Sequence, residues 1–296
     1  MRLGDEPESS NFEDRTGRAG SGLGGGGIGG GAFGLIFQLV ASKFGIVGIL
    51  VLLLGYCALT SLGGGGILGG GGSPSASAPA GKSTLDAATQ QLLVRTLGST
   101  EEVWGEIFQQ AGKQYTPTRM IAYSNSDQSG CGAAQAAMGP FYCPTDQQIY
   151  IDPSFFNELS QRFGAPGDFA QAYVIAHEVG HHIQDLKGTL DRAHNAQSGA
   201  SEASGNQVQV GVELQADCYA GVWAARARDA QGSLLEPGDV EEGMRAAEAI
   251  GDDTLQKQSQ GRVVPESFTH GSAAQRMEAL KRGLSTGNPA ACNYAS

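Results

Sequence analysis

The sequence is poor in positive charge. Its 296 residues include 19 Lys and Arg against 30 Asp and Glu, which gives a formal net charge of −11. The basic residues are scattered and form no extended run. A nucleic-acid-binding surface needs clustered Lys and Arg opposite the phosphates. We therefore expect no nucleic-acid partner.

Charge is absent altogether from residues 45–62, which are almost entirely apolar. This run is long enough for a membrane helix, and it begins too far from residue 1 for a cleavable signal peptide. Arg15, Arg18 and Lys43 precede it, whereas the next basic residue is Lys82. The bias predicts a single-pass membrane protein, with its N-terminus in the cytoplasm and the rest outside. The alternative is a buried core helix.

Glycine is abundant, and half of the 46 glycines lie before residue 73. Gly-rich polar segments cannot bury a core, whereas Gly/Ser/Pro segments act as flexible tethers. We expect four parts: a disordered cytoplasmic tail over residues 1–31, a transmembrane anchor over 32–62, a linker over 63–84, and a globular domain over 85–296.

The globular part alternates between two kinds of hydrophobic pattern. Aromatic and β-branched residues around a turn predict short strands or a hairpin over residues 141–151. Residues 188–205 are polar and predict a loop. Asp168 is expected to cap the helix that follows it, and Gly283 or Gly287 to lie near the end of the last helix. Helical spacing predicts helices over residues 85–97, 101–111, 154–163, 169–186, 206–229, 239–250 and 272–284. The expected fold class is α+β, mainly helical with a small β element.

Residues 177–181 read His-Glu-Val-Gly-His, the H-E-x-x-H pattern of zinc peptidases. On a helix, His177 and His181 lie one turn apart on the same face and can bind one cation. Glu178 lies beside that face, where it can act as general base on a zinc-bound water. His182 is rotated off the face and is expected behind the ligands or at the surface. The alternative is a solvated helix that carries two histidines by chance.

The third ligand must come from elsewhere in the sequence. Longer motifs place Gly and His three and six residues after the second ligand, but Gln184 and Lys187 stand there, which excludes that class. Glu213 on the following helix fits the other solution, a distant glutamate. Asp217, one turn further on, would accept the N–H of a ligand histidine. Other candidates for the third ligand are Glu202, His194 and His270.

These residues carry a resemblance to a known family. Residues 177–182 together with Glu213 and Asp217 resemble a gluzincin-type zinc peptidase, and the chain is similar to the bacterial neutral zinc metallopeptidase family of membrane-anchored, YpfJ-like proteins. Phe12 and Thr16 depart from the family pattern. The resemblance implies a zincin-like domain with one Zn²⁺ per chain. The further matching stretches are ESSNFEDR (8–15), GPFYCP (139–144), ADCYAGVW (216–223) and SFTHGS (267–272).

The expected reaction is hydrolysis of a peptide bond in a peptide or protein substrate. Three protein ligands leave one zinc position for water, and the oxyanion needs one further donor. His270 is the candidate for this catalytic role, whereas Tyr219 is expected to be a core aromatic. Residues 141–151 offer a strand edge for the substrate. The alternative function is a catalytically inactive, zinc-containing, membrane-tethered binding protein.

Four cysteines follow the apolar run, in a part of the chain expected in an oxidising compartment. Cys131 and Cys143 flank a Gly-containing turn and are expected to pair. This leaves Cys218 with Cys292, which would attach the C-terminus to the helix of Glu213. Other pairings and buried free thiols remain alternatives.

Overall fold

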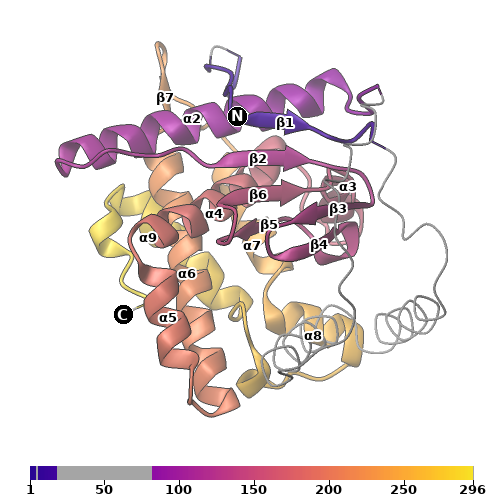
Figure 1. The fold of residues 1–296 in the computed structure, drawn as a ribbon, viewed down its shortest axis with the longest axis vertical. Coiled ribbons are helices and arrows are strands. Elements are labelled where there is room, and N and C mark those ends of the chain that lie inside the picture. The colour runs from indigo at the N-terminus through magenta and orange to yellow at the C-terminus, as the bar shows by residue number, and fades with distance from the viewer. Residues whose placement is uncertain (5, 19–81, 296) are drawn as a thin grey trace, which may run out of the picture.

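The computed structural model describes residues 1–4, 6–18 and 82–295 (Figure 1). Within these ranges the fold is mixed α+β and mainly helical, as the sequence predicted at this level. The helices are α2 (Ala87–Gln110), α3 (Ser154–Gln161), α4 (Asp168–Leu186), α5 (Thr189–Gln197), α6 (Glu202–Arg226), α7 (Asp239–Ala249), α8 (Asp252–Gln260) and α9 (Ala273–Thr286). The strands are β1 (Phe12–Asp14), β2 (Arg119–Ala122), β3 (Ser126–Ser129), β4 (Gly132–Gln135), β5 (Phe141–Cys143), β6 (Gln148–Ile151), β7 (Arg228–Asp229) and β8 (Gly232–Ser233).

A four-stranded sheet has the order β1-β2-β6-β5. The first three strands are parallel, and β5 is antiparallel to β6, with Tyr142 opposite Ile149. The β5–β6 pair confirms the hairpin predicted over residues 141–151. Met120 and Ile149 of the sheet share a core cluster with Leu97 of α2 and Val179 of α4. The sheet thereby holds α4 in place.

Close contact between α4 and α6 depends on small residues. A Cβ added to Gly180 would lie 3.0 Å from both the Cα and the carbonyl oxygen of Ala216. A helix-interior glycine costs roughly 1 kcal/mol relative to Ala, so Gly180 is explained by this approach. It brings the face of α4 that carries the two motif histidines against Glu213 of α6.

Helices α6 and α9 approach one another even more closely. A Cβ on Gly221 would collide with the Leu280 carbonyl oxygen, and one on Gly283 with the Cys218 carbonyl oxygen. Gly283 is therefore a packing residue inside α9. The helix ends at Thr286, and the cap residue Gly287 follows it with a φ of 55°, which lies in the left-handed region.

Several predicted boundaries are wrong. The two helices expected over residues 85–97 and 101–111 are one continuous helix, α2, in which Thr100 between the two predicted ranges is buried and donates its hydroxyl to the Leu97 carbonyl. The loop expected over residues 188–205 contains α5 and the start of α6. Helix α6 ends at Arg226, before the predicted end at residue 229, and α8 was not predicted. Asp168 is the first residue of α4 and makes no capping hydrogen bond.

The disordered tail expected over residues 1–31 is wrong where the structure describes it. Phe12–Asp14 is strand β1, which pairs with β2, and Phe12 packs against the core. Phe12 is the only residue of this short strand that packs against the core. The segment therefore lacks the alternating apolar pattern from which a strand is predicted. The predicted anchor over residues 32–62 lies outside the described residues. Among the described ones, none of the helices combines the length and the apolar character needed to cross a membrane.

Both predicted disulfides form. Cys131 and Cys143 have a Cα–Cα distance of 5.8 Å, and Cys218 and Cys292 one of 5.6 Å. The first closes the turn before β5. The second attaches the C-terminal segment to α6, at the residue after Asp217.

Candidate metal centre

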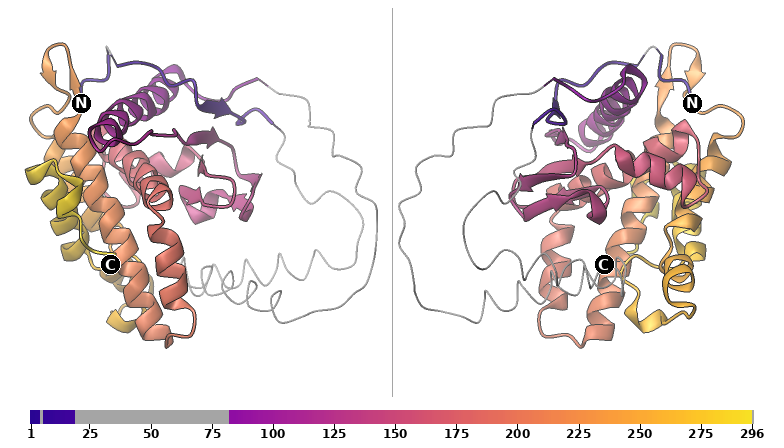
Figure 2. Two further views of the ribbon diagram at one scale, coloured as in Figure 1. Left: turned by 60° about the vertical axis from the view of Figure 1, so that its left-hand side comes forward. Right: turned by 90° about the vertical axis from the view of Figure 1, so that its right-hand side faces the viewer.

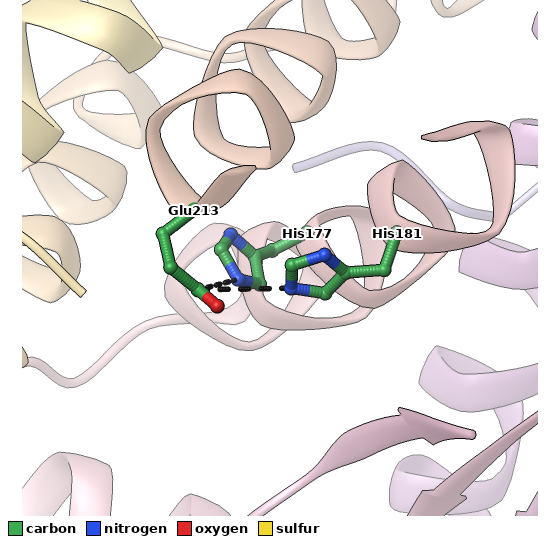
Figure 3. Close-up of side chains that lie close together, drawn as sticks. All are labelled: His177, His181 and Glu213. Carbon is green, nitrogen blue, oxygen red and sulfur yellow. Dashed lines mark ion pairs between the residues drawn. The ribbon is translucent and has the colours of Figure 1, made fainter. Parts of the chain in front are cut away.

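Three side chains from two helices meet at one point. The Nε2 atoms of His177 and His181 lie 3.2 and 3.6 Å from Oε2 of Glu213 (Figure 3). Ligand atoms bound about 2.0–2.1 Å from a tetrahedral zinc ion are roughly 3.3 Å apart. All three residues are buried or nearly so. Two imidazoles and a carboxylate at these separations fit a zinc ion with one position left for a further ligand.

His177 is oriented by Asp217, as the sequence suggested. Its Nδ1–H donates to Oδ1 of Asp217 at 2.8 Å. Asp217 is fully buried and also accepts from the Tyr173 hydroxyl at 2.6 Å. Because Nδ1 carries the proton, Nε2 keeps its lone pair for a metal.

Arg276 of α9 binds Asp217 from the opposite side. Its Nε donates to Oδ2 and one terminal nitrogen donates to Oδ1, both at 2.9 Å. The same nitrogen lies 3.3 Å from the Tyr173 hydroxyl. This two-pronged pair neutralises a carboxylate that would otherwise be buried as a lone charge.

His181 is oriented by a neutral group. Its Nδ1–H donates to Oε1 of Gln184 at 2.9 Å. The Gln184 amide donates in turn to the Val212 carbonyl at 2.7 Å and to Gln215 Oε1 at 3.1 Å. Gln215 donates to the Cys292 carbonyl at 2.7 Å. The orientation of His181 is thus linked to the C-terminal segment.

The electrostatics of the cluster favour positive charge. Burial lowers the pKa of His177, but the charge and hydrogen bond of Asp217 and the bond to Glu213 raise it to about 10. For His181, burial likewise lowers the pKa, and the nearby charge of Glu213 raises it further than burial lowers it. Burial raises the pKa of Asp217, yet the charges of Arg276 and His177 bring it down to about 2. Carboxylates that stay ionised in a buried site are suited to a cation.

The two predicted catalytic residues lie close to the ligands. Glu178 is buried next to His177, and its charge contributes to the raised pKa of His181. The charge of His270 acts on Glu213. His270 donates from Nδ1 to Asp252 Oδ1 at 3.2 Å, and the backbone N–H groups of residues 269–271 donate to Asp252 Oδ2 at 2.7–3.0 Å. Asp252 therefore holds the loop that carries His270.

Other predicted residues lie elsewhere. His182 is buried, contrary to a surface position, and its ring nitrogens lie 2.7 Å from the Thr116 carbonyl and 3.1 Å from the Tyr142 hydroxyl. Tyr219 is a core aromatic, as expected, edge-on to Trp104. The alternative ligands Glu202 and His194 are exposed on α6 and α5.

Three supporting residues were missed from the sequence: Gln184, Arg276 and Asp252. Gln184 follows His181 by three residues, a helical spacing that permits the contact. Arg276 and Asp252 approach only through the packing of α9 and α8, for which the sequence carries no local signal. A further carboxylate cluster, Asp168, Asp239 and Glu242, has no imidazole.

An H-E-x-x-H helix with a glutamate supplied by a second helix defines a zinc-peptidase type of site. The comparisons agree with this class: the family described as "Putative neutral zinc metallopeptidase" matches residues 1–295. The chain belongs to this family.

Its relatives include "Uncharacterized protein YpfJ" of Escherichia coli K12, which is 44% identical over 99% of this chain and 98% of its own length. "Uncharacterized protein Rv2575" of Mycobacterium tuberculosis H37Rv is 44% identical over 69% of this chain and 70% of its own. No solved structure matches.

Proposed function

We propose that this protein is a zinc-dependent peptidase. The observation that carries the proposal is the convergence of His177, His181 and Glu213 on one point, with Glu178 buried beside it. A structural zinc site usually closes with a fourth Cys or His, whereas the described residues supply three ligands here and place Glu178 beside the first of them. Family membership supports the same reaction class.

Each residue has a defined task in hydrolysis. Zinc, when held by His177, His181 and Glu213, supplies a Lewis acid that polarises a carbonyl and activates water. Glu178 takes the proton of the attacking water and delivers it to the leaving amine.

His270 donates a hydrogen bond from its charged ring to the developing oxyanion. Burial lowers its pKa, but the hydrogen bond of Asp252 and the charge of Glu213 raise it above the usual value, so the ring favours its charged form. Asp252 also fixes the ring through Nδ1, which leaves Nε2 for the substrate. A donor held in place before reaction stabilises the transition state without reorganisation.

The proposed location is an extracytoplasmic domain attached to the bacterial inner membrane. Two disulfides support an oxidising compartment, because cytosolic thiols are kept reduced. The apolar residues 45–62 supply the proposed attachment.

The full-length chain in detergent provides the test, because β1 belongs to the folded unit and a fragment starting at Thr84 would lack it. Glu178→Gln should keep its zinc and lose cleavage of a peptide library, since the amide cannot accept the proton. Glu202→Gln, an exposed acid on α6, is the matched control and should cleave normally. Cleavage by Glu178→Gln at the parent rate would refute the role of Glu178 as general base, whereas no cleavage by the parent itself would leave a zinc-containing binding protein.

A further inference from the structure

The N-terminal segment, residues 6–18, is built into the peptidase domain. Strand β1 pairs in parallel with β2, with Phe12 opposite Met120 and Asp14 opposite Ala122. The ladder continues at both ends: the Met120 N–H donates to the Asn11 carbonyl at 2.9 Å, and the Arg15 N–H to the Ala122 carbonyl at 2.7 Å. The segment therefore completes the central sheet.

Side chains reinforce this attachment. Ser9 and Asn11 donate to the same Glu101 carboxylate oxygen of α2, at 2.6 and 2.8 Å. Arg15 pairs with Asp127 of β3 at 3.1 Å, at a position where both side chains are largely buried. Figure 2 shows the indigo N-terminal segment running along α2 in two further views. Charge-assisted contacts to two separate elements fix the segment in one register.

Helix α2 is shaped to receive this segment. Gly98 lies in the middle of the helix, and a Cβ there would collide with the Pro7 carbonyl oxygen. The Ser9 N–H donates to the Val94 carbonyl at 3.0 Å, one turn earlier. A glycine inside a helix is unfavourable by roughly 1 kcal/mol relative to Ala. Docking of the N-terminal segment supplies the physical reason for it.

The described residues on either side of residues 19–81 lie next to each other. The Thr84 N–H donates to the Thr16 hydroxyl oxygen at 3.0 Å, just before α2 begins. The chain therefore returns beside the point where it leaves. The intervening residues 19–81 include the apolar run of residues 45–62.

We infer that residues 1–18 and residues 82–295 occupy the same side of the membrane. A strand hydrogen-bonded to β2 cannot lie across a hydrocarbon core about 30 Å thick. The excess of Arg and Lys before the apolar run predicts the opposite, with the two parts separated, and the β1–β2 pairing overrides that rule. The inference rests on the proposed membrane attachment, and with the proposed location it puts both parts outside.

Single-cysteine labelling in spheroplasts tests the inference on the full chain. Ser10→Cys and Lys281→Cys, each in a Cys57→Ser background, place one thiol at an exposed position of each part. A membrane-impermeant maleimide should label both before permeabilisation. Labelling of one part before and the other only after would overturn the inference. Labelling of both only after permeabilisation would support it, and would reject the extracytoplasmic location separately.

A pair of glycine variants tests whether the docking exists in the membrane-bound protein. Gly98→Ala should release residues 6–18 and make Arg15 and Arg18 sensitive to trypsin added on the side of the domain. Gly105→Ala in the same helix is the control, because its Cβ would meet nothing within 4 Å among the described residues. Equal resistance of both variants and the parent would contradict the docked arrangement, as would equal sensitivity of all three.

Discussion

The two histidines of the metal centre are supported in different ways. His177 donates to Asp217, a buried charge that is balanced by Arg276. His181 donates to Gln184, a neutral amide whose other contacts are also neutral. The first support fixes orientation and adds negative charge behind the ligand, whereas the second fixes orientation alone. The two histidines therefore share one contribution to metal affinity, a fixed ring orientation. They differ in the other, the negative charge behind the imidazole.

The largest effect is expected on stability, from Arg276, which balances the charged support of His177. Arg276→Met leaves Asp217 buried with one cationic partner fewer. Removal of one member of a buried ion pair costs roughly 3–5 kcal/mol, so the free energy of unfolding should fall by about that amount. Denaturant unfolding with and without zinc measures it. Arg276→Lys keeps the charge without the two-pronged geometry and should recover part of the loss. No loss in Arg276→Met would show that Asp217 needs no counter-charge.

A smaller loss is expected at Asp217 itself. Asp217→Asn retains an acceptor for His177 but removes the negative charge, so zinc should bind roughly 10- to 100-fold more weakly. Competition with a chromophoric chelator measures the affinity. An unchanged affinity would make the charge behind His177 irrelevant.

For the neutral support of His181, Gln184→Met should weaken zinc binding by about 10-fold. This is the lower end of the range for groups that orient ligands. The variant removes the acceptor for His181 but no charge. Gln161→Met, exposed on α3, serves as the control. A loss of zinc affinity greater than that of Asp217→Asn would show that the neutral support of His181 contributes more than the charged support of His177.

The smallest expected effect is a change in the number of protons released when zinc binds. The pKa of His177 is raised to about 10, so this ring binds a proton at neutral pH when no ion competes, and the pKa of His181 also lies above its usual value. Zinc needs neutral imidazoles, so it should displace about one proton from His177 and bind more tightly as pH rises. In Asp217→Asn the negative charge that raises the pKa of His177 is lost, so fewer protons should be released. Calorimetry in buffers of different ionisation enthalpy counts them.

The sequence identified the parts of the site that lie close together along the chain. His177, Glu178 and His181 follow from helical spacing, and Glu213 with Asp217 follows from the same spacing on a second helix. Gln184 was within reach of the same reasoning. Arg276 and Asp252 were not, because their positions depend on how α9 and α8 pack, and the contact of Gly221 with Gly283 has no local signature.

The fold was predicted where apolar periodicity was strong. The hairpin over residues 141–151 and helix α4 are examples. The N-terminal strand was missed because one buried residue, Phe12, carries its packing, and its remaining attachment comes from backbone pairing and ion pairs with distant elements. Composition alone therefore favoured disorder.

Arg276 and Cys292 both belong to the last part of the chain, and both contact α6 next to the ligand glutamate. A chain still being synthesised on the ribosome lacks these residues until the end. Asp217 then has no counter-charge, and Gln215 has no Cys292 carbonyl to bind. The contacts that support the metal centre are thus complete only when the last residues have packed against α6. Order of synthesis therefore places the support of the site last, after all three of its ligand residues have been made.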